Sequence, residues 1–366
     1  MITEDREPES FRSRQLRLIS PFQVEESESV INLEEGFVVI EPTLASICHA
    51  DLRYFGGLRN QEILAKKLPM ALIHEGIGKV IISKSPTLPV GTRVVIVPNV
   101  PGYVLRRTSA EQCCPACRGE IQDNYCDRGY FLGSGKDGIA QNRLMIPEEC
   151  IVPIPADVPD EIAVLSELCS VSIRAARCVS QFLSNHVVAV FGDGPVGYIT
   201  AAVLHHAFQI PKERLVVFGA IPEKLSAFTF AQTELVRDYD FLAASAHVVF
   251  ECTGGNFSES AINQGIDLMA RGGHLVLMGV SEERVPINTR DVLEKGITLH
   301  GSSRSSRIDF EDILQMMKSS EAISTLSKLL PEHYTEISNA ADFTAAMQET
   351  LQHKGWQKTL LQFKWS

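Results

Sequence analysis

Three residues whose side chains commonly bind zinc, Cys48, His74 and Glu167, lie in the first half of the chain. His74 is followed directly by Glu75, which adds a second carboxylate to the set. A catalytic zinc takes about three or four nitrogen, sulfur or oxygen ligands and keeps one position open to water or substrate. The set matches this composition, with Glu75 beside the metal, although spacing alone does not establish the site. The set is thus a candidate catalytic zinc site, and the alternative is that each of these residues is an ordinary core or surface residue.

A second group of metal-binding side chains is confined to a short segment of the chain. It consists of four cysteines, Cys113, Cys114, Cys117 and Cys126. A Cys-x-x-Cys pair with a further cysteine nearby is typical of a structural zinc site, because thiolates hold zinc in a closed shell. The alternative is a set of free thiols in a loop.

A glycine-rich segment, Gly192-Asp193-Gly194-Pro195-Val196-Gly197, follows the apolar run 187–191 and precedes a helix-like segment at 196–208. In this context the glycines allow a tight turn and a close approach of the backbone to a pyrophosphate. The N-terminus of the helix then faces the phosphates. The segment predicts a dinucleotide site, and the alternative is an ordinary glycine-rich turn between a strand and a helix.

The choice between NAD and NADP depends on the end of the next strand. In NAD-binding folds a carboxylate at that position usually binds the ribose 2′-hydroxyl. Here the apolar run 215–218 ends at Gly219, which has no carboxylate to repel a 2′-phosphate. Lys224, and less directly Arg214, would add positive charge, although Lys224 alone is equally compatible with a solvated helix position. The segment favours NADP.

The elements that must position these residues change in type along the chain. Residues 15–105 contain short β-branched runs bounded by glycine, proline and asparagine, such as 38–40, 78–82 and 93–97. This pattern predicts a strand-rich first half. From about residue 187, apolar strands alternate with helix-like segments, which predicts a parallel doubly wound sheet of α/β type. The expected strands are 187–191, 215–218, 248–252, 274–278 and 297–300, with helices at 196–208, 223–230 and 309–318 and a closing strand at 358–363.

Composition narrows the class of protein further. The chain has 366 residues, 45 acidic and 34 basic side chains and a net charge of −11. A surface of this sign repels phosphate backbones and anionic lipid, so we expect no nucleic-acid partner and no membrane partner. The charged N-terminal residues 1–14 resemble no signal peptide. Nine cysteines without such a signal indicate a reducing, cytoplasmic location.

Taken together, these motifs resemble those of the zinc-dependent medium-chain dehydrogenase/reductase superfamily over nearly the whole chain. Its motifs appear here as Cys48-His49-Ala50-Asp51, His74-Glu75-Gly76, the four cysteines, Gly192–Gly197 and Glu251-Cys252-Thr253-Gly254. Within the superfamily the chain looks most like the ribitol-5-phosphate dehydrogenases, also called ribulose-5-phosphate reductases. The segments that carry this closer resemblance are 68–76, 192–200, 260–264, 279–282 and 288–305.

The resemblance implies a fold and a set of site residues. It implies a GroES-like, β-rich catalytic domain, residues 1–183 plus 304–366, interrupted by a Rossmann domain at 184–303. Cys48, His74 and Glu167 correspond to the catalytic zinc ligands, Glu75 to an acidic neighbour of the metal, and Asp51 to a carboxylate near the histidine ligand. The residues that correspond to contacts with the nicotinamide half of the cofactor are Thr253, Gly279, Val280 and Ser302.

The resemblance also implies an activity. It implies the reduction of D-ribulose 5-phosphate to D-ribitol 5-phosphate with NADPH, assisted by Zn²⁺, in a pathway that supplies CDP-ribitol for teichoic acid or capsule. A phosphorylated sugar is then the substrate, a cytidylyltransferase is an expected partner, and a homodimer is the expected assembly. Two alternatives stay open: an NAD-dependent dehydrogenase of unphosphorylated polyols, of the sorbitol dehydrogenase type, and a metal-free member kept for binding. The intact zinc-ligand set argues against the second.

Two positions depart from the pattern of the family. Many relatives have serine or threonine two residues after the zinc cysteine as a proton relay, whereas this chain has Ala50. The proton must then travel through water, His49 or the ribose. In relatives that carry a structural zinc, the first cysteine ligand aligns with Glu111 of this chain. Cys113 is an additional cysteine relative to that pattern. The fourth structural ligand is therefore either Cys113 or Glu111.

Overall fold

The computed structural model describes residues 10–119, 121–353 and 355–365. Two compact units are present. The first holds the described residues up to Glu167, residues 306–314 and those from 330 onward, and the second holds residues 168–305 and 315–329. The resemblance places the interrupting domain at 184–303, so the second unit also takes in 168–183, 304–305 and 315–329.

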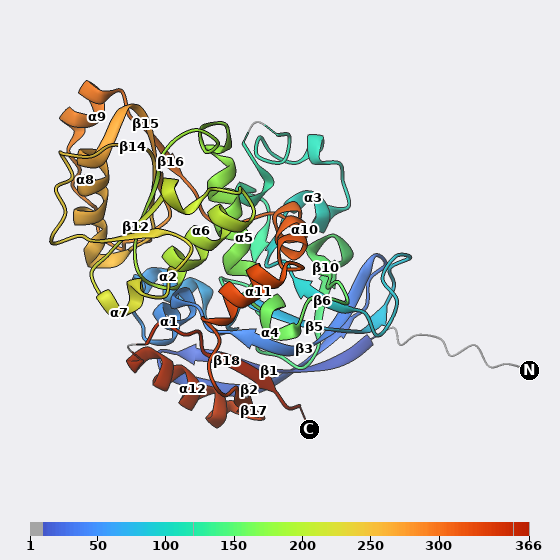
Figure 1. Cartoon of the computed structure of the whole chain (residues 1–366). Coiled ribbons are helices and arrows are strands. Elements are labelled where there is room, and N and C mark those ends of the chain that lie inside the picture. Colours follow the sequence, from blue (N-terminus) through green and yellow to red (C-terminus); the bar gives the residue numbers. More distant parts are fainter. Residues whose placement is uncertain (1–9, 120, 354, 366) are drawn as a thin grey trace, which may run out of the picture. The chain divides into compact units, whose positions relative to one another are not determined.

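The main sheet of the first unit has seven strands (Figure 1). Its order is β10 (Ile151–Pro153), β6 (Arg93–Ile96), β5 (Glu75–Ser83), β3 (Phe37–Ser46), β18 (Leu360–Phe363) and β17 (Thr335–Ile337), with β9 (Leu144–Pro147) also paired to β3. The strand expected at 358–363 is confirmed as β18. The register places Ser46, the last residue of β3, opposite Glu75 on one side and Leu360 on the other. The sheet therefore brings together the chain near residues 46, 75 and 358.

Smaller elements complete the first unit. A three-stranded sheet has the order β2 (Gln23–Asn32), β1 (Ser10–Ser20) and β4 (Met70–Ala71), and β7 (Asn99–Val100) pairs with β8 (Tyr130–Phe131). The helices are α1 (His49–Phe55), α2 (Gln61–Lys67), α3 (Gly102–Arg106), α4 (Asp160–Ala163), most of α10 (Arg307–Met316), and α12 (Ala340–Gln352). The strand-rich first half that the sequence predicts is thus observed.

The second unit contains a six-stranded parallel sheet. Its order is β13 (Gln232–Leu235), β12 (Leu215–Gly219), β11 (Val188–Phe191), β14 (Ala246–Glu251), β15 (Met269–Leu277) and β16 (Thr298–Gly301). From β11 the chain first adds strands on one side of the sheet, β12 and β13, and then on the other side, β14, β15 and β16. The strand order therefore reverses between β11 and β14. Doubly wound sheets bind ligands at such a switch point. The parallel sheet that the sequence predicts is confirmed.

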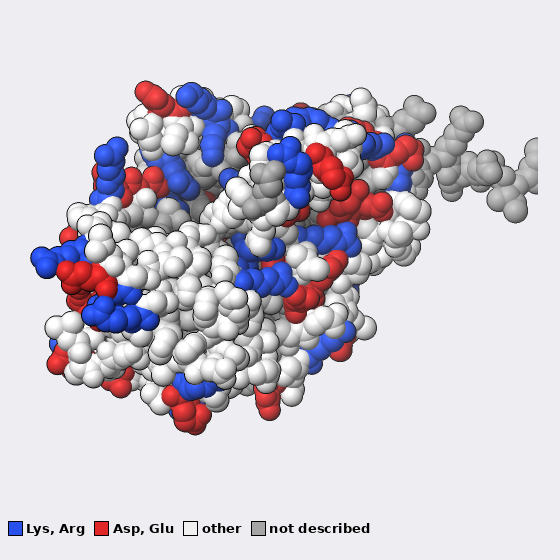
Figure 2. All heavy atoms as spheres, turned by 90° about the horizontal axis from the view of Figure 1, so that it is seen from above, with Lys and Arg blue, Asp and Glu red and all other residues white. Residues whose placement is uncertain are grey.

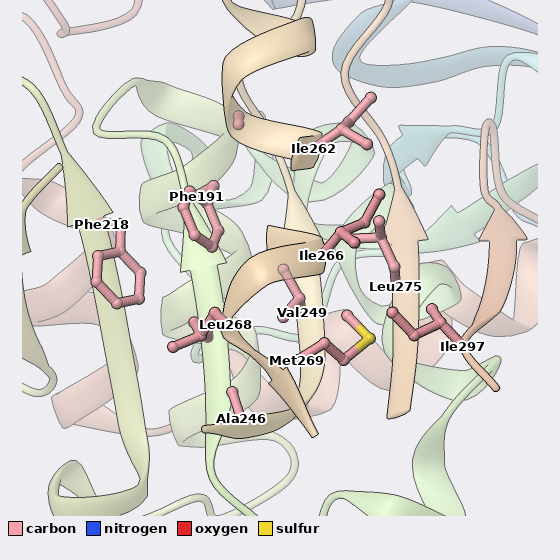
Figure 3. Packing of buried hydrophobic residues seen from close by; sticks show 12 residues of the cluster. Phe191, Phe218, Ala246, Val249, Ile262, Ile266, Leu268, Met269, Leu275 and Ile297 are labelled. Carbon is pink, nitrogen blue, oxygen red and sulfur yellow. The ribbon is translucent and has the colours of Figure 1, made fainter. Parts of the chain in front are cut away.

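The helices of this unit are α5 (Ser166–Arg177) from residue 168, α6 (Pro195–His206), α7 (Pro222–Leu225), α8 (Ser258–Leu268), α9 (Thr289–Lys295) and α11 (Ser320–Ser327). A hydrophobic core cluster lies between the sheet and α8, where side chains of the four strands β11, β12, β14 and β15 pack with Ile262 and Ile266 (Figure 3). Phe191 and Phe218 stack with their ring centroids 4.7 Å apart. All four strand residues of β11 are buried, which explains its uninterrupted apolar sequence.

Two details differ from the expected elements. The helix expected at 223–230 ends at Leu225, and Phe228 is instead buried against the ring of Tyr198, 4.9 Å away. Strand β13 was not expected, because three of its four side chains are exposed and polar at the edge of the sheet.

Among the described residues, no helix has the length and apolar character needed to span a membrane. Acidic and basic side chains are interspersed on the face drawn in Figure 2.

Candidate metal and cofactor sites

Cys48 stands at the N-cap of α1, and Asp51 fixes its position. The Asp51 carboxylate is fully buried and accepts a hydrogen bond from the backbone N–H of Cys48 at 3.0 Å. Its other oxygen accepts from the backbone N–H of Ile73 at 3.1 Å and lies 3.2 Å from Nδ1 of His74. Asp51 therefore joins the turn that carries Cys48 to the segment that carries His74, as the resemblance implies for this residue.

The backbone before His74 is strained. Ile73 has a φ of +72°, a left-handed conformation that β-branched residues rarely adopt. Its N–H donates to Asp51, and its carbonyl accepts from the N–H of Ile139 at 2.8 Å. Strain of this kind persists where surrounding contacts enforce it and is concentrated at functional sites.

Glu75 is held by a buried cation that the sequence analysis did not identify. Nζ of Lys358 lies 2.8 Å from Oε2 of Glu75 and donates to the carbonyl of Ile47 at the same distance. Ser46 donates its hydroxyl to the same oxygen of Glu75. The second oxygen, Oε1, is buried and has no hydrogen-bond partner among the described residues. A buried carboxylate oxygen without a partner is unfavourable unless a cation binds it.

Cys48, His74 and Glu75 form one cluster, called here the Cys48 cluster. One ligand atom from each lies within 4.8 Å of the others. Nδ1 of His74 is engaged by Asp51, which leaves Nε2 to bind a metal. Burial raises the pKa of the Cys48 thiol, and the Glu75 carboxylate raises it further. Thiolate, imidazole and carboxylate are the donors that zinc prefers, so this donor set and the free Oε1 of Glu75 fit a zinc ion.

Glu167 lies beside the Cys48 cluster without being part of it. It is buried near the start of α5 and interacts electrostatically with His74, Glu75 and Lys358. Burial raises the pKa of Glu167 to about 7, with His74 opposing the shift and Glu75 adding to it. Three of the four residues expected at the catalytic zinc are thus brought within ligand distance of one another, and Glu167 is their buried neighbour.

The four cysteines Cys113, Cys114, Cys117 and Cys126 form the four-cysteine cluster. The sulfur of Cys126 lies 3.8 Å from that of Cys113 and 3.7 Å from that of Cys114, and the sulfurs of Cys114 and Cys117 are 3.6 Å apart. Zinc–sulfur bonds of about 2.3 Å in a tetrahedron place sulfurs about 3.8 Å apart. The sulfur positions therefore fit one zinc ion. Glu111 is exposed and lies outside the cluster, so the geometry favours Cys113 as the fourth ligand.

The glycine-rich segment forms the predicted turn between β11 and α6. Gly192 has a φ of +133°, and a Cβ on Gly197 would lie 2.0 Å from the carbonyl oxygen of Gly192. Both positions therefore require glycine. A Cβ on Gly194, the N-cap of α6, would meet no heavy atom within 4 Å, so the backbone there is open to a ligand. The turn fits a pyrophosphate at the N-terminus of α6.

A carboxylate lies beside Gly219, whereas the sequence predicts none at the end of this strand. A Cβ on Gly219 would lie 2.7 Å from Cβ of Asp193 and 2.9 Å from its Oδ2, so the Asp193 side chain fills this space. No role for Asp193 follows from the sequence pattern, although the residue is part of the glycine-rich segment. The strand end lacks an acid of its own, but a carboxylate reaches it from the neighbouring loop. Lys224 is half-buried on α7 and has no ion pair among the described residues.

Glu251, which the sequence identifies only as part of a family motif, organises the loops expected to contact the nicotinamide. Its buried carboxylate accepts from the backbone N–H groups of Thr253 at 2.9 Å and Gly279 at 3.1 Å. A side chain on Gly279 would collide with this carboxylate. Val280 is half-exposed, whereas Ser302 is buried and its hydroxyl has no partner among the described residues. The signal was available, because a carboxylate ending a buried strand usually has a role.

The chain matches two protein-family models and is similar to several known proteins. Residues 34–156 match the alcohol dehydrogenase GroES-like domain, and residues 231–319 match the zinc-binding dehydrogenase family. The chain is 37% identical to ribulose-5-phosphate reductase 1 of Staphylococcus aureus, over 95% of this chain and 98% of that one. It is 36% identical to ribulose-5-phosphate reductase of Bacillus spizizenii, over 95% and 98% of the two chains. The crystal structure of S. aureus TarJ in complex with NADPH is similar, with a TM-score of 0.81, 32% identity and coverage of 97% of this chain and 100% of that one.

Proposed function

The chain belongs to the zinc-dependent medium-chain dehydrogenase/reductase superfamily, and on this premise we propose that it reduces D-ribulose 5-phosphate to D-ribitol 5-phosphate with NADPH. The single observation that carries the substrate is the identity with ribulose-5-phosphate reductases over nearly the full length of both chains. The similarity to TarJ in complex with NADPH supports the cofactor. The Cys48 cluster supports a metal-assisted reaction at a ketone oxygen.

Residues at the catalytic site have two roles: some bind the metal, and others hold those ligands in position. Cys48, His74 and Glu75 are the nearest donors, and Glu167 is a fourth, displaced donor that can approach the ion. A zinc bound there supplies a Lewis acid that polarises the substrate ketone. Asp51 accepts the Nδ1 proton of His74 and so fixes the tautomer that leaves Nε2 for the metal. Lys358 compensates the charge of Glu75 and holds one of its oxygens in place.

In the second unit the chain provides the cofactor site. The N–H groups at the start of α6 bind the pyrophosphate, Glu251 holds the loops of Thr253 and Gly279, and Lys224 supplies positive charge near the end of β12. NADPH supplies the hydride for the ketone carbon. Ala50 has no hydroxyl to relay the proton, so the route through water, His49 or the ribose stays open.

The four-cysteine cluster has a separate task in this proposal. Four thiolates fill the coordination shell of a zinc ion and leave no position for a substrate, which is typical of a structural site. Burial raises the pKa of the Cys117 thiol, and its cysteine neighbours raise it further. A bound cation reverses this effect and keeps all four sulfurs deprotonated. We therefore assign Cys113, Cys114, Cys117 and Cys126 to a structural zinc.

The cellular setting follows from the product. Ribitol 5-phosphate is the substrate that a cytidylyltransferase would convert to CDP-ribitol, for teichoic acid or capsule. We place the enzyme in the cytoplasm, where NADPH is available, and expect a homodimer. Size measurement in solution tests the dimer, and fractionation of cells tests the location.

A substrate panel tests the proposed function. Ribulose 5-phosphate, xylulose 5-phosphate, ribulose and fructose are each offered with NADPH and with NADH. The proposal predicts the highest kcat/KM for ribulose 5-phosphate with NADPH, and a large loss for ribulose, which lacks only the phosphate. Preference for an unphosphorylated ketose with NADH would instead identify a polyol dehydrogenase.

Lys224 offers a test of the cofactor site. At an effective dielectric of about 20, charges about 4 Å apart attract by about 4 kcal/mol before solvent and relaxation reduce this value. Lys224→Ala should therefore weaken NADPH binding about tenfold and change NADH binding little. Dissociation constants measured by titration with each cofactor check this prediction. An equal loss for both cofactors would contradict a contact between Lys224 and the 2′-phosphate.

A further inference from the structure

Asp193 makes contacts that none of its neighbours in the glycine-rich turn makes. Its Oδ2 accepts hydrogen bonds from the backbone N–H groups of Ala220 at 2.7 Å and of Ile221 at 2.8 Å. These residues directly follow Gly219, the last residue of β12. The side chain therefore crosses from the end of one strand to the end of the next.

The geometry also explains why residue 219 is glycine. A Cβ there would meet the side chains of Asp193, at 2.7 Å, and Leu225, at 2.8 Å. Contacts this short require one of the neighbours to move. An acidic side chain at position 219 is therefore disfavoured by packing as well as by charge. The carboxylate of Asp193 stands 2.9 Å from the place where the side chain of an acid at 219 would begin.

We propose that Asp193 is a specificity-determining residue for the adenosine end of the nicotinamide cofactor, because its carboxylate takes the place of the missing strand-end acid. The inference rests on the proposed function in that it requires this turn to bind a nicotinamide dinucleotide. A ribose 2′-hydroxyl can donate to the carboxylate, whereas a 2′-phosphate is repelled by it. Two backbone N–H groups already compensate part of the charge on Oδ2, and Lys224 adds a cation nearby.

This arrangement has a consequence for cofactor choice. The Asp193 charge reduces a preference for NADPH that Gly219 and Lys224 would otherwise make larger. Removal of the charge without loss of the hydrogen-bond acceptor should then strengthen binding of ligands that carry a 2′-phosphate. A role confined to supporting the turn would affect ligands with and without that phosphate equally.

Asp193→Asn is the variant that separates these roles, because the amide oxygen can still accept from Ala220 and Ile221. Binding of 2′,5′-ADP and of 5′-AMP, which differ only in the 2′-phosphate, is measured by calorimetry, without substrate, so the result does not depend on the identity of the sugar. We expect the ratio of the two dissociation constants to shift about threefold or more toward 2′,5′-ADP. Hydrogen exchange at Ala220 and Ile221 reports whether the turn keeps its structure.

Asp238→Asn is the matched control, because it removes one negative charge from an exposed position of the same unit. It should leave the ratio unchanged. A shift in Asp193→Asn no larger than in this control, or equal weakening of both ligands, would overturn the proposal. Unmutated protein that binds 5′-AMP more tightly than 2′,5′-ADP would contradict the NADPH assignment, whereas the shift between variants would still test Asp193.

Discussion

The Cys48 cluster and the four-cysteine cluster belong to the same unit and both fit zinc, but their surroundings differ. The Cys48 cluster combines sulfur, nitrogen and oxygen donors, and two of its three side chains contact further polar groups: Asp51 contacts His74, and Lys358 and Ser46 contact Glu75. The four cysteines contact one another, and their hydrophobic neighbours include Tyr103 and Ala116. The first site is surrounded by charged side chains, whereas the four sulfurs are surrounded by one another, by apolar side chains and by backbone N–H groups such as that of Gly102, 3.2 Å from the sulfur of Cys126.

The difference supports the separate roles proposed for the two sites. Polar groups around a metal ligand orient it and tune the metal, which matters where a substrate must bind and react. Four thiolates satisfy the metal completely, so such a site contributes to folding. Composition and surroundings, taken together, separate a reactive site from a structural one where a count of ligands does not.

The largest expected effect follows from the loss of a ligand in the Cys48 cluster. Cys48→Ala removes the thiolate and lowers both zinc affinity and Lewis acidity. We predict a fall in kcat/KM of about 10³-fold or more for ribulose 5-phosphate with NADPH. Steady-state kinetics check the prediction, and circular dichroism verifies the fold. Substantial turnover by the metal-depleted variant would remove the catalytic role of this cluster.

A smaller effect should follow from the loss of a supporting group. Asp51→Asn leaves Cys48, His74 and Glu75 in the chain but replaces the carboxylate beside Nδ1 of His74. Changes of this kind reduce metal affinity or activity about 10- to 100-fold. Competition with a chelator measures zinc affinity directly. Unchanged affinity together with unchanged turnover would show that the contact between Asp51 and His74 is only structural.

The four-cysteine cluster should respond in a different way. Cys114→Ser removes a ligand whose sulfur lies 3.6 Å and 3.7 Å from two others, so the structural zinc should be lost. We predict a decrease in Tm of about 5 °C or more, with kcat per folded molecule within about threefold of the unmutated value. Calorimetric melting and kinetics on the same preparation check both parts. A collapse of kcat with an unchanged Tm would reverse the assignment.

The smallest effect is expected at Glu111, and it distinguishes the two possible fourth ligands. Glu111 is exposed and stands apart from the sulfurs, so Glu111→Ala should leave zinc content and Tm unchanged. Cys113→Ser should instead behave like Cys114→Ser. Metal analysis of both variants decides between them. Loss of zinc from Glu111→Ala alone would assign the fourth position to the carboxylate.

The sequence anticipated residues that lie in local motifs and missed those that act across the chain. The glycine turn and the strands around it could be predicted, because a buried strand and a required glycine leave local patterns. The pairing of Lys358 with Glu75 and of Asp193 with the turn after Gly219 could not, because sheet register and loop geometry create these contacts. The resemblance to the family leaves Cys113 and Glu111 as alternatives, since only the folded loop separates them.

Zinc content and turnover, measured on the same samples of Cys48→Ala and Cys114→Ser, test the division of labour between the two clusters most directly. The unmutated protein should contain two zinc ions per chain, and each variant should contain one. Turnover should survive in Cys114→Ser and disappear in Cys48→Ala. One zinc per chain in the unmutated protein, unaffected by Cys114→Ser, or equal loss of turnover in both variants would contradict the account.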